Sequence, residues 1–199
     1  MEEEKSAVDI LKDIAKKEGW EISVKERVLN RRTHDRTYRV VVIKNPLQKD
    51  TFFISATTQN MAKYEFYSGI FIPVNGFSRF KLHMRNRNIL DKLNVFKNKQ
   101  GFKIGNTKFD SNVLVETNHD TEAHKLLSSS GIQYDIIQFF KRSNLLHIGV
   151  NENNPDFNSE LKAKSCLSVF INNEWMLDEE IIHETFRIAE KLKNKLNNL

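Results

Sequence analysis

The hydrophobic period changes twice along this chain, and this change limits the possible folds more than any other feature. At both ends apolar residues recur at helical spacing, whereas much of the middle alternates apolar and polar residues as β-strands do. The N-terminal segment 6–18 begins at Ser6, which fits a capping box with Asp9, and it stops before Gly19. The pattern therefore predicts an N-terminal helix that leads into a β-rich middle.

The C-terminal segment 178–199 carries the clearest helical pattern of the chain. Acids occupy its first turn and lysines its last, an arrangement that complements the helix dipole. Its apolar stripe consists of Ile181, Ile182, Thr185, Phe186, Ala189, Leu192 and Leu196. Such a stripe indicates a helix that packs across a sheet.

The middle of the chain contains a series of β-rich runs separated by Pro, Gly and polar residues. The runs cover residues 22–28, 36–43, 51–58, 69–76, 78–86, 145–150 and 165–171. The runs 36–43 and 51–58 predict an antiparallel hairpin, because the connection around Pro46 is too short for a helical crossover. Shorter strand or turn pieces are expected at 101–105 and 111–117.

Further helices are expected between these runs. Segment 88–96 predicts a short helix, segment 120–129 a helix capped by Asn118 or Asp120, and segment 131–142 another helix. The chain has 199 residues and no internal repeat or Gly/Ser linker, so a single domain over residues 1–199 is expected. The predicted class is α+β: an antiparallel sheet of about five to seven strands with an N-terminal helix, one or two middle helices and a long C-terminal helix packed on the sheet.

Cysteine usage and hydropathy exclude several classes of protein. Cys166 is the sole cysteine, which excludes an intramolecular disulfide and a zinc site built on several thiolates. The run around Cys166 predicts a buried small side chain and not a nucleophile. No segment approaches ~18 uncharged apolar residues, so we expect a cytoplasmic protein without an integral membrane segment. No phosphate-binding glycine loop exists, and no cofactor is expected.

The stretch from Ile104 to Leu127 gathers Asp, Glu and His residues and raises the question of a site. In a helix that starts near Asp120, Asp120 and His124 share a face, while His119 points elsewhere. This spacing does not match that of the zinc proteases. A solvated helix start is therefore the favoured interpretation, and a metal or acid–base site that includes Glu122 is the alternative. We expect no catalytic or metal-ligating residue here.

The same stretch resembles a pattern found in a family of uncharacterised bacterial proteins. The pattern reads Gly-Asp-x-x-Phe-Asp, an apolar strand, and then Asp-x-x-x-Ala-x-x-Leu-Leu. The matching residues are Phe109, Asp110, Ala123, Leu126 and Leu127, while Asn106 stands where the pattern has Asp. The resemblance covers about the second half of the chain. It implies an architecture, and it implies no activity and no catalytic residues.

The segment 79–87 is the most distinctive feature of the sequence. In a β-strand its potential cations would face one way, about 6.6 Å apart, with Phe80, Leu82 and Met84 on the core side. Those cations are Arg79, Lys81, His83, Arg85 and Arg87. Such a row predicts a polyanion-binding surface, to which Arg31 and Arg32 in a nearby loop would add. The alternative, which the sequence favours, is a solvent-facing strand whose charges pair across the sheet with acids such as Glu26 or Glu116.

These observations leave three hypotheses of function. The first is a non-enzymatic binding or interaction module that uses a polar sheet face or a cleft between sheet and helix, with another protein or an acidic partner. The second is a polyanion or nucleic-acid binder that uses the basic segment. Nucleic acid is the weaker form of it, because the segment lacks exposed aromatic residues for base stacking. The third is an enzyme with a His/Asp/Glu site.

Overall fold

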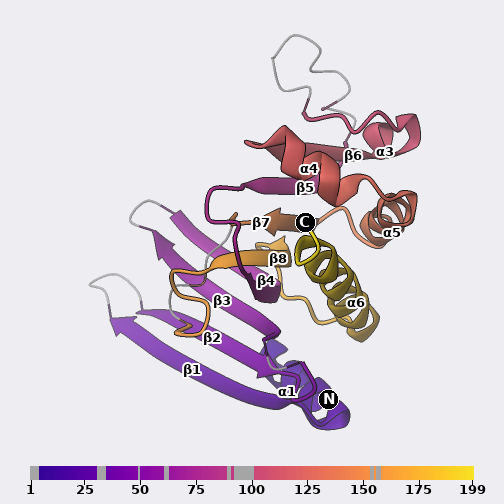
Figure 1. Cartoon of the computed structure of the whole chain (residues 1–199). Coiled ribbons are helices and arrows are strands. Elements are labelled where there is room, and N and C mark those ends of the chain that lie inside the picture. The colour runs from indigo at the N-terminus through magenta and orange to yellow at the C-terminus, as the bar shows by residue number, and fades with distance from the viewer. Residues whose placement is uncertain are drawn as a thin grey trace.

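Every pair of neighbouring strands in the central sheet runs antiparallel. The computed structural model describes residues 5–30, 35–48, 50–60, 63–88, 91, 101–152, 155 and 158–199. Within them the strands are β1 (Glu21–Asn30), β2 (Asp35–Lys44), β3 (Phe52–Asn60), β4 (Lys63–Val74), β5 (Leu82–Asn86), β6 (Val113–Thr117), β7 (Leu146–Val150) and β8 (Ser165–Asn172). They form one sheet in the order β1-β2-β3-β4-β8-β7-β5-β6 (Figure 1).

Five helices accompany the sheet in the described part of the chain. They are α1 (Ala7–Glu18), α3 (Thr107–Asn112), α4 (Asp120–Leu127), α5 (Ser130–Phe140) and α6 (Glu179–Leu196). Figure 1 shows the sheet extending from β1 at one edge to β6 at the other, with α5 and α6 beside it. The main core forms where the helices pack on one face of the sheet, and it includes Leu11 of α1, Ile136 of α5 and Phe186 of α6. No helix of the described residues is both long and apolar enough to span a bilayer.

The central strands are buried on both faces, which explains their nearly continuous apolar sequences. In β3, Phe53 joins the main core, while its neighbours Phe52 and Ile54 belong to a second cluster on the opposite face. Leu161, from the connection between β7 and β8, covers this second cluster and is fully buried. Alternation along a strand sends successive side chains to opposite faces, so both faces must be apolar wherever both are covered.

Strands β4 and β8 form the seam between the two halves of the sheet. Gly69 of β4 lies opposite Phe170 of β8 in the register. A Cβ atom at Gly69 would lie 2.3 Å from the Val169 carbonyl oxygen, closer than side-chain carbons approach backbone. Glycine is therefore required where these two strands meet.

The predicted α+β class is confirmed, including the antiparallel sheet and both terminal helices. The sheet has eight strands instead of five to seven, and three middle helices are present instead of one or two. The α6 stripe is buried as predicted except for half-buried Ile181, and Ile188 is buried as well. The predicted strand 78–86 is wrong in its first part, because β5 starts only at Leu82. The predicted helix 88–96 lies almost entirely outside the described residues.

Candidate functional site

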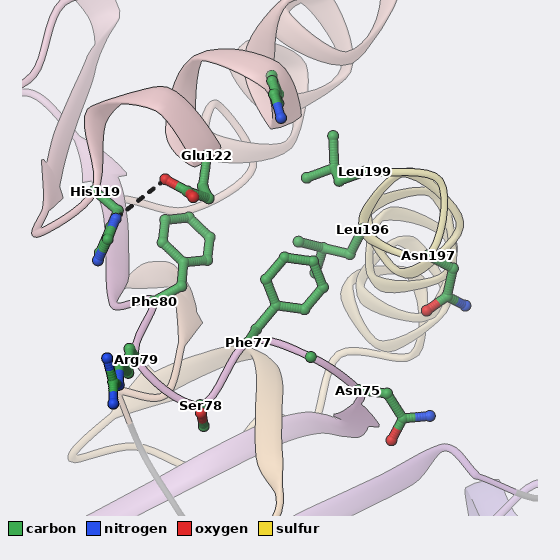
Figure 2. A pocket seen from close by; sticks show the side chains of 12 residues that line it. Asn75, Phe77, Ser78, Arg79, Phe80, His119, Glu122, Leu196, Asn197 and Leu199 are labelled. Atoms are coloured by element: carbon green, nitrogen blue, oxygen red, sulfur yellow. Dashed lines mark ion pairs between the residues drawn. The ribbon is translucent and has the colours of Figure 1, made fainter.

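A cleft of about 750 Å³ opens between the sheet and two helices. It is bounded by the connection between β4 and β5, by the start of α4 and by the end of α6 (Figure 2). We call it the sheet–helix cleft, and we call residues 75–81 the cleft loop. Its apolar lining comes from Phe77 and Phe80 of the loop and from Leu196 and Leu199. Figure 2 shows both phenyl rings turned toward the space between the helices.

Asn118, just after β6, holds one part of the cleft loop through its side chain. Its Oδ1 accepts a hydrogen bond from the Lys81 N–H at 2.7 Å, and its Nδ2 donates to the Arg79 carbonyl at 2.8 Å. The Thr117 hydroxyl adds a hydrogen bond to the Lys81 carbonyl at 3.0 Å. The loop thus has fixed partners for backbone groups that a strand would otherwise have paired.

Asn151, just after β7, holds the rest of the loop. Its Nδ2 donates to the carbonyls of Phe77 and Phe80 at 2.7 and 2.8 Å, and its Oδ1 accepts from the Cys166 N–H at 3.0 Å. Asn151 has a φ of 55°, a left-handed conformation that asparagine tolerates better than most residues. The two asparagines together make four hydrogen bonds to the backbone of the cleft loop and one to the Cys166 N–H of β8. These five bonds fix one wall of the cleft.

The polar lining of the cleft contains two cations and one acid. Arg79 and Lys125 are exposed, and neither has an ion-pair partner among the described residues. Glu122 lies 3.2 Å from His119, between its Oε2 and the histidine Nδ1, a contact that becomes an ion pair when His119 is protonated. This Oε2 atom is buried and accepts no well-directed hydrogen bond in the described part of the chain. The cleft thus combines an apolar floor with two cations that form no ion pair among the described residues.

The segment 79–87 alternates as predicted, but its charges differ in their surroundings. Phe80, Leu82 and Met84 are buried. Arg79 and Lys81 are exposed and precede β5, while His83, Arg85 and Arg87 are half-buried. Arg31 and Arg32 lie outside the described residues. The free cations of this segment that the structure describes are therefore at its start, beside the cleft.

Arg85 forms an ion pair with Asp91. Its Nη1 and Nη2 donate to the two carboxylate oxygens of Asp91, both at 2.7 Å. This bidentate pair lowers the pKa of Asp91 and raises that of Arg85, chiefly through the hydrogen bonds. The side chains are only 26% and 16% exposed, so the pair is shielded from solvent.

His83 forms a relay with two other side chains on the face of the sheet away from the main core. Its Nε2 lies 2.9 Å from Nδ1 of His147, and its Nδ1 lies 3.4 Å from Oε2 of Glu116, the residue opposite it on β6. Pairing with Glu116 is what the alternative interpretation of the basic segment expected; Glu26 pairs with Arg39 instead. Burial, then the nearby His83 and Arg85, lower the pKa of His147 to about 4.

The run from His119 to His124 does not assemble into a metal site. His119 and Glu122 face the cleft, whereas Asp120 and His124 are exposed at the start of α4. The predicted cap of this helix is wrong: His119 occupies the N-cap position without a side-chain hydrogen bond, because Asn118 is committed to the cleft loop. The helix itself begins at Asp120, as the sequence indicates.

Among the described residues, one group of three potential metal ligands has its ligand atoms within 4.8 Å of one another: Glu18, Glu179 and His183. The Lys17 ammonium lies 2.5 Å from Glu179 and lowers the pKa of this carboxyl group through their hydrogen bond. His183 Nε2 lies 3.6 Å from Glu18 and 3.8 Å from Glu179. The group joins the end of α1 to the start of α6 by ion pairing.

The residues that carry the family resemblance have structural positions in this chain. The Asn106 side chain caps α3 by accepting from the N–H groups of Lys108 and Phe109. Asp110 accepts from the N–H groups of Ile104 and Gly105, both at 3.0 Å, and Phe109 is fully buried. Ala123, Leu126 and Leu127 are also buried. The motif thus builds a helix cap and a core contact.

Cys166 is buried, as predicted, and burial raises the pKa of its thiol to about 12. A thiol in that state carries almost no thiolate, so it is inert as a nucleophile.

Comparison of the chain with protein-family models, with curated proteins and with solved structures finds no match in any of the three.

The sequence left open whether binding would use a polar sheet face or a cleft between sheet and helix, and it did not identify the residues of this cleft. Arg79 was among the predicted binding residues, whereas Phe77, Lys125 and the two supporting asparagines were missed. A faint signal existed, since "NGFS" before Arg79 contains turn residues that interrupt a strand. Nothing local indicates that Asn118 and Asn151 meet at this loop, because both contacts span long stretches of chain.

Proposed function

We propose that this protein is a non-enzymatic binding module whose ligand is a small molecule held in the sheet–helix cleft. The observation that carries the proposal is the fixed wall of the cleft: Asn118 and Asn151 hold the loop that presents Phe77 and Phe80. A prebuilt wall lowers the entropy cost of binding, because the protein does not have to order the loop when the ligand arrives. Small-molecule sites are commonly preformed for this reason.

The size of the cleft supports the same conclusion. Its volume of about 750 Å³ falls within the range of roughly 300–1,000 Å³ typical of small-molecule sites. Its apolar floor of Phe77, Phe80, Leu196 and Leu199 lies beside a larger set of polar and charged residues, so the lining is more polar than that of most small-molecule sites. We place the protein in the cytoplasm, where the absence of disulfides and the reduced Cys166 fit the redox conditions.

The polyanion hypothesis stays second. In its favour, Arg79 and Lys81 are exposed. Against a continuous cationic row, Arg85 is bound to Asp91 and His83 faces His147. The salt dependence of polyanion binding grows with the number of phosphate contacts, and the described part of the segment supplies only two free cations.

The test uses a neutral apolar dye, N-phenyl-1-naphthylamine, with the whole chain. Fluorescence titration measures its affinity, and backbone amide shifts locate it. We expect the shifts to cluster at residues 76–80 and 119–125. Phe77→Ala should weaken binding several-fold, whereas Leu47→Ala, which removes a side chain 93% exposed on the β2–β3 connection, should leave it unchanged.

Two outcomes would contradict the proposal. One is the absence of binding at the solubility limit of the dye. The other is binding with amide shifts spread over surfaces far from the cleft, or binding that Phe77→Ala does not weaken while its melting temperature stays that of the parent chain.

A further inference from the structure

We propose that the ligand of the sheet–helix cleft is an amphipathic anion, with an apolar body and one negatively charged head. This inference rests on the proposed function, since it names the ligand of the same cleft. Its basis is the combination of an apolar floor with Arg79 and Lys125, two cations that form no ion pair among the described residues.

The apolar body is matched by the floor of the cleft. Phe80 is buried behind Phe77, and their ring centroids are 6.0 Å apart at 54°. Phe77 and Leu199 remain partly exposed on opposite sides of the cleft, while Leu196 is buried between the helix and the loop. A ligand body placed among them would cover apolar surface that now faces water, which favours binding.

The charged head is matched by Arg79 and Lys125. Arg79 belongs to the cleft loop, and its carbonyl accepts a hydrogen bond from Asn118, so its side chain extends from a fixed backbone position. Lys125 comes from the last turn of α4. Guanidinium and ammonium groups both bind carboxylate and phosphate oxygens well.

The charges of the lining, including its one acid, indicate how many negative charges the head of the ligand carries. Arg79 and Lys125 contribute two positive charges and Glu122 one negative, so these three side chains leave one positive charge in excess. A head with a single negative charge matches this excess better than a polyanion does.

The decisive experiment compares two dyes with the same aromatic body. N-phenyl-1-naphthylamine is neutral, and 8-anilinonaphthalene-1-sulfonate carries one negative charge. Two exposed cations contribute modestly each, so we expect the sulfonate to bind roughly tenfold more tightly. In the double variant Arg79→Gln with Lys125→Gln the two affinities should become equal.

The matched control is Lys108→Gln with Lys162→Gln. Both control residues are exposed and lie outside the cleft lining, and the control lowers the net charge by the same two units. It should keep the preference for the sulfonate. Melting temperatures of both double variants, expected to equal that of the parent, exclude misfolding as the cause.

The outcomes separate this inference from the proposed function. Binding of both dyes at equal affinity would overturn the anion assignment and leave the cleft as a binding site. Binding of neither would overturn both. A preference that survives Arg79→Gln with Lys125→Gln, or that the control also removes, would overturn the role of these two cations.

The nature of the head is resolved by competition. Decanoate and octyl phosphate, each added to displace the bound sulfonate dye, represent a carboxylate and a phosphate source of the same chemistry. Displacement by either one supports the inference and identifies the preferred head. Failure of both below their micelle concentrations would overturn it.

Discussion

The ring of Phe186 in α6 packs against the indole of Trp20, with centroids 5.0 Å apart and planes inclined by 51°. Trp20 follows Gly19, the left-handed residue that ends α1. The contact therefore joins the N-terminal and C-terminal helices, which the sequence places at opposite ends of the chain. It fixes how both helices lie on the sheet.

Phe186→Ala should lower the free energy of unfolding by about 3–5 kcal/mol, because it removes a buried ring and leaves a cavity between α6 and Trp20. Urea unfolding followed by circular dichroism measures the change. Tyr134→Ala is the control: this side chain is 56% exposed on α5, and its removal should cost about 0.5 kcal/mol or less. Equal effects of the two substitutions would contradict the packing of α6.

Asn118→Ala should destabilise the protein by about 1–3 kcal/mol, because the Lys81 N–H and the Arg79 carbonyl lose their partner. It should also weaken dye binding in the cleft, since the wall is no longer held. Asn198→Ala removes an exposed asparagine near the end of α6 and should do neither. Unchanged amide exchange of residues 79–81 in Asn118→Ala would show that the side chain does not hold the loop.

A double-mutant cycle on Arg85→Ala and Asp91→Ala should give a coupling of about 1–2 kcal/mol. The pair is bidentate and mostly shielded from solvent, and each single substitution leaves a charge without its partner. The same cycle on the exposed pair Asp9 and Lys12 should give about 0.5 kcal/mol or less. A coupling for Arg85 and Asp91 as small as that of the exposed pair would show that Asp91 does not hold Arg85, which would then count among the free cations of the basic segment.

Stability should fall as the pH is lowered from about 6.5 to about 4 through the titration of His147. Its pKa is near 4 in the folded protein and near the ordinary 6.5 when unfolded, so the unfolded state binds more protons across this window. The contribution of His147 is fully present above the window and is lost through it. Carboxyl groups also titrate at acid pH, so the informative quantity is a difference between variants.

His147→Gln should therefore lose less stability across that window than the parent chain does, measured as the shift of the urea midpoint. His124→Gln, at an exposed position on α4, should behave like the parent. If the two variants have the same pH profile, His147 is not held neutral by burial and by its neighbours His83 and Arg85.

Asn106→Ala should cost about 0.5–2 kcal/mol, because the Asn106 side chain caps α3. Asp120→Ala should cost about 0.5 kcal/mol or less, since Asp120 is exposed and the N-cap of α4 makes no side-chain hydrogen bond. Thermal unfolding of the two variants side by side is sufficient. The reverse order of the two effects would restore Asp120 as a capping residue.

The sequence predicted those parts of the fold that depend on local pattern. The helix over 6–18, the stripe of α6 and the alternation of Phe80, Leu82 and Met84 all follow from hydrophobic period, and all are present. The start of β5 was misplaced because Arg79 and Lys81 continue the alternation although their backbone groups bind Asn118 and not a neighbouring strand. The hydrophobic period indicates which face of a strand a side chain takes. It does not indicate which partner the backbone groups of that residue bind.

The candidate site was less predictable for the same reason. Its parts come from the β4–β5 connection, from α4 and from the end of α6, and only the long-range contacts of the sheet bring them together. Arg85 looked as free as Arg79 in the sequence. The difference between them is the bidentate contact with Asp91, a residue within a segment whose helical pattern gives no sign of it.

The seam at Gly69 has a consequence for how the chain is made. Strands β1 to β4 follow one another in order and can pair as soon as they leave the ribosome, but the partner of β4 across the seam is β8, at residues 165–172. Until that segment is synthesised, the edge of β4 that pairs with β8 has open backbone groups. A nascent chain stalled before β8 should therefore be the form most prone to aggregate and most dependent on chaperones.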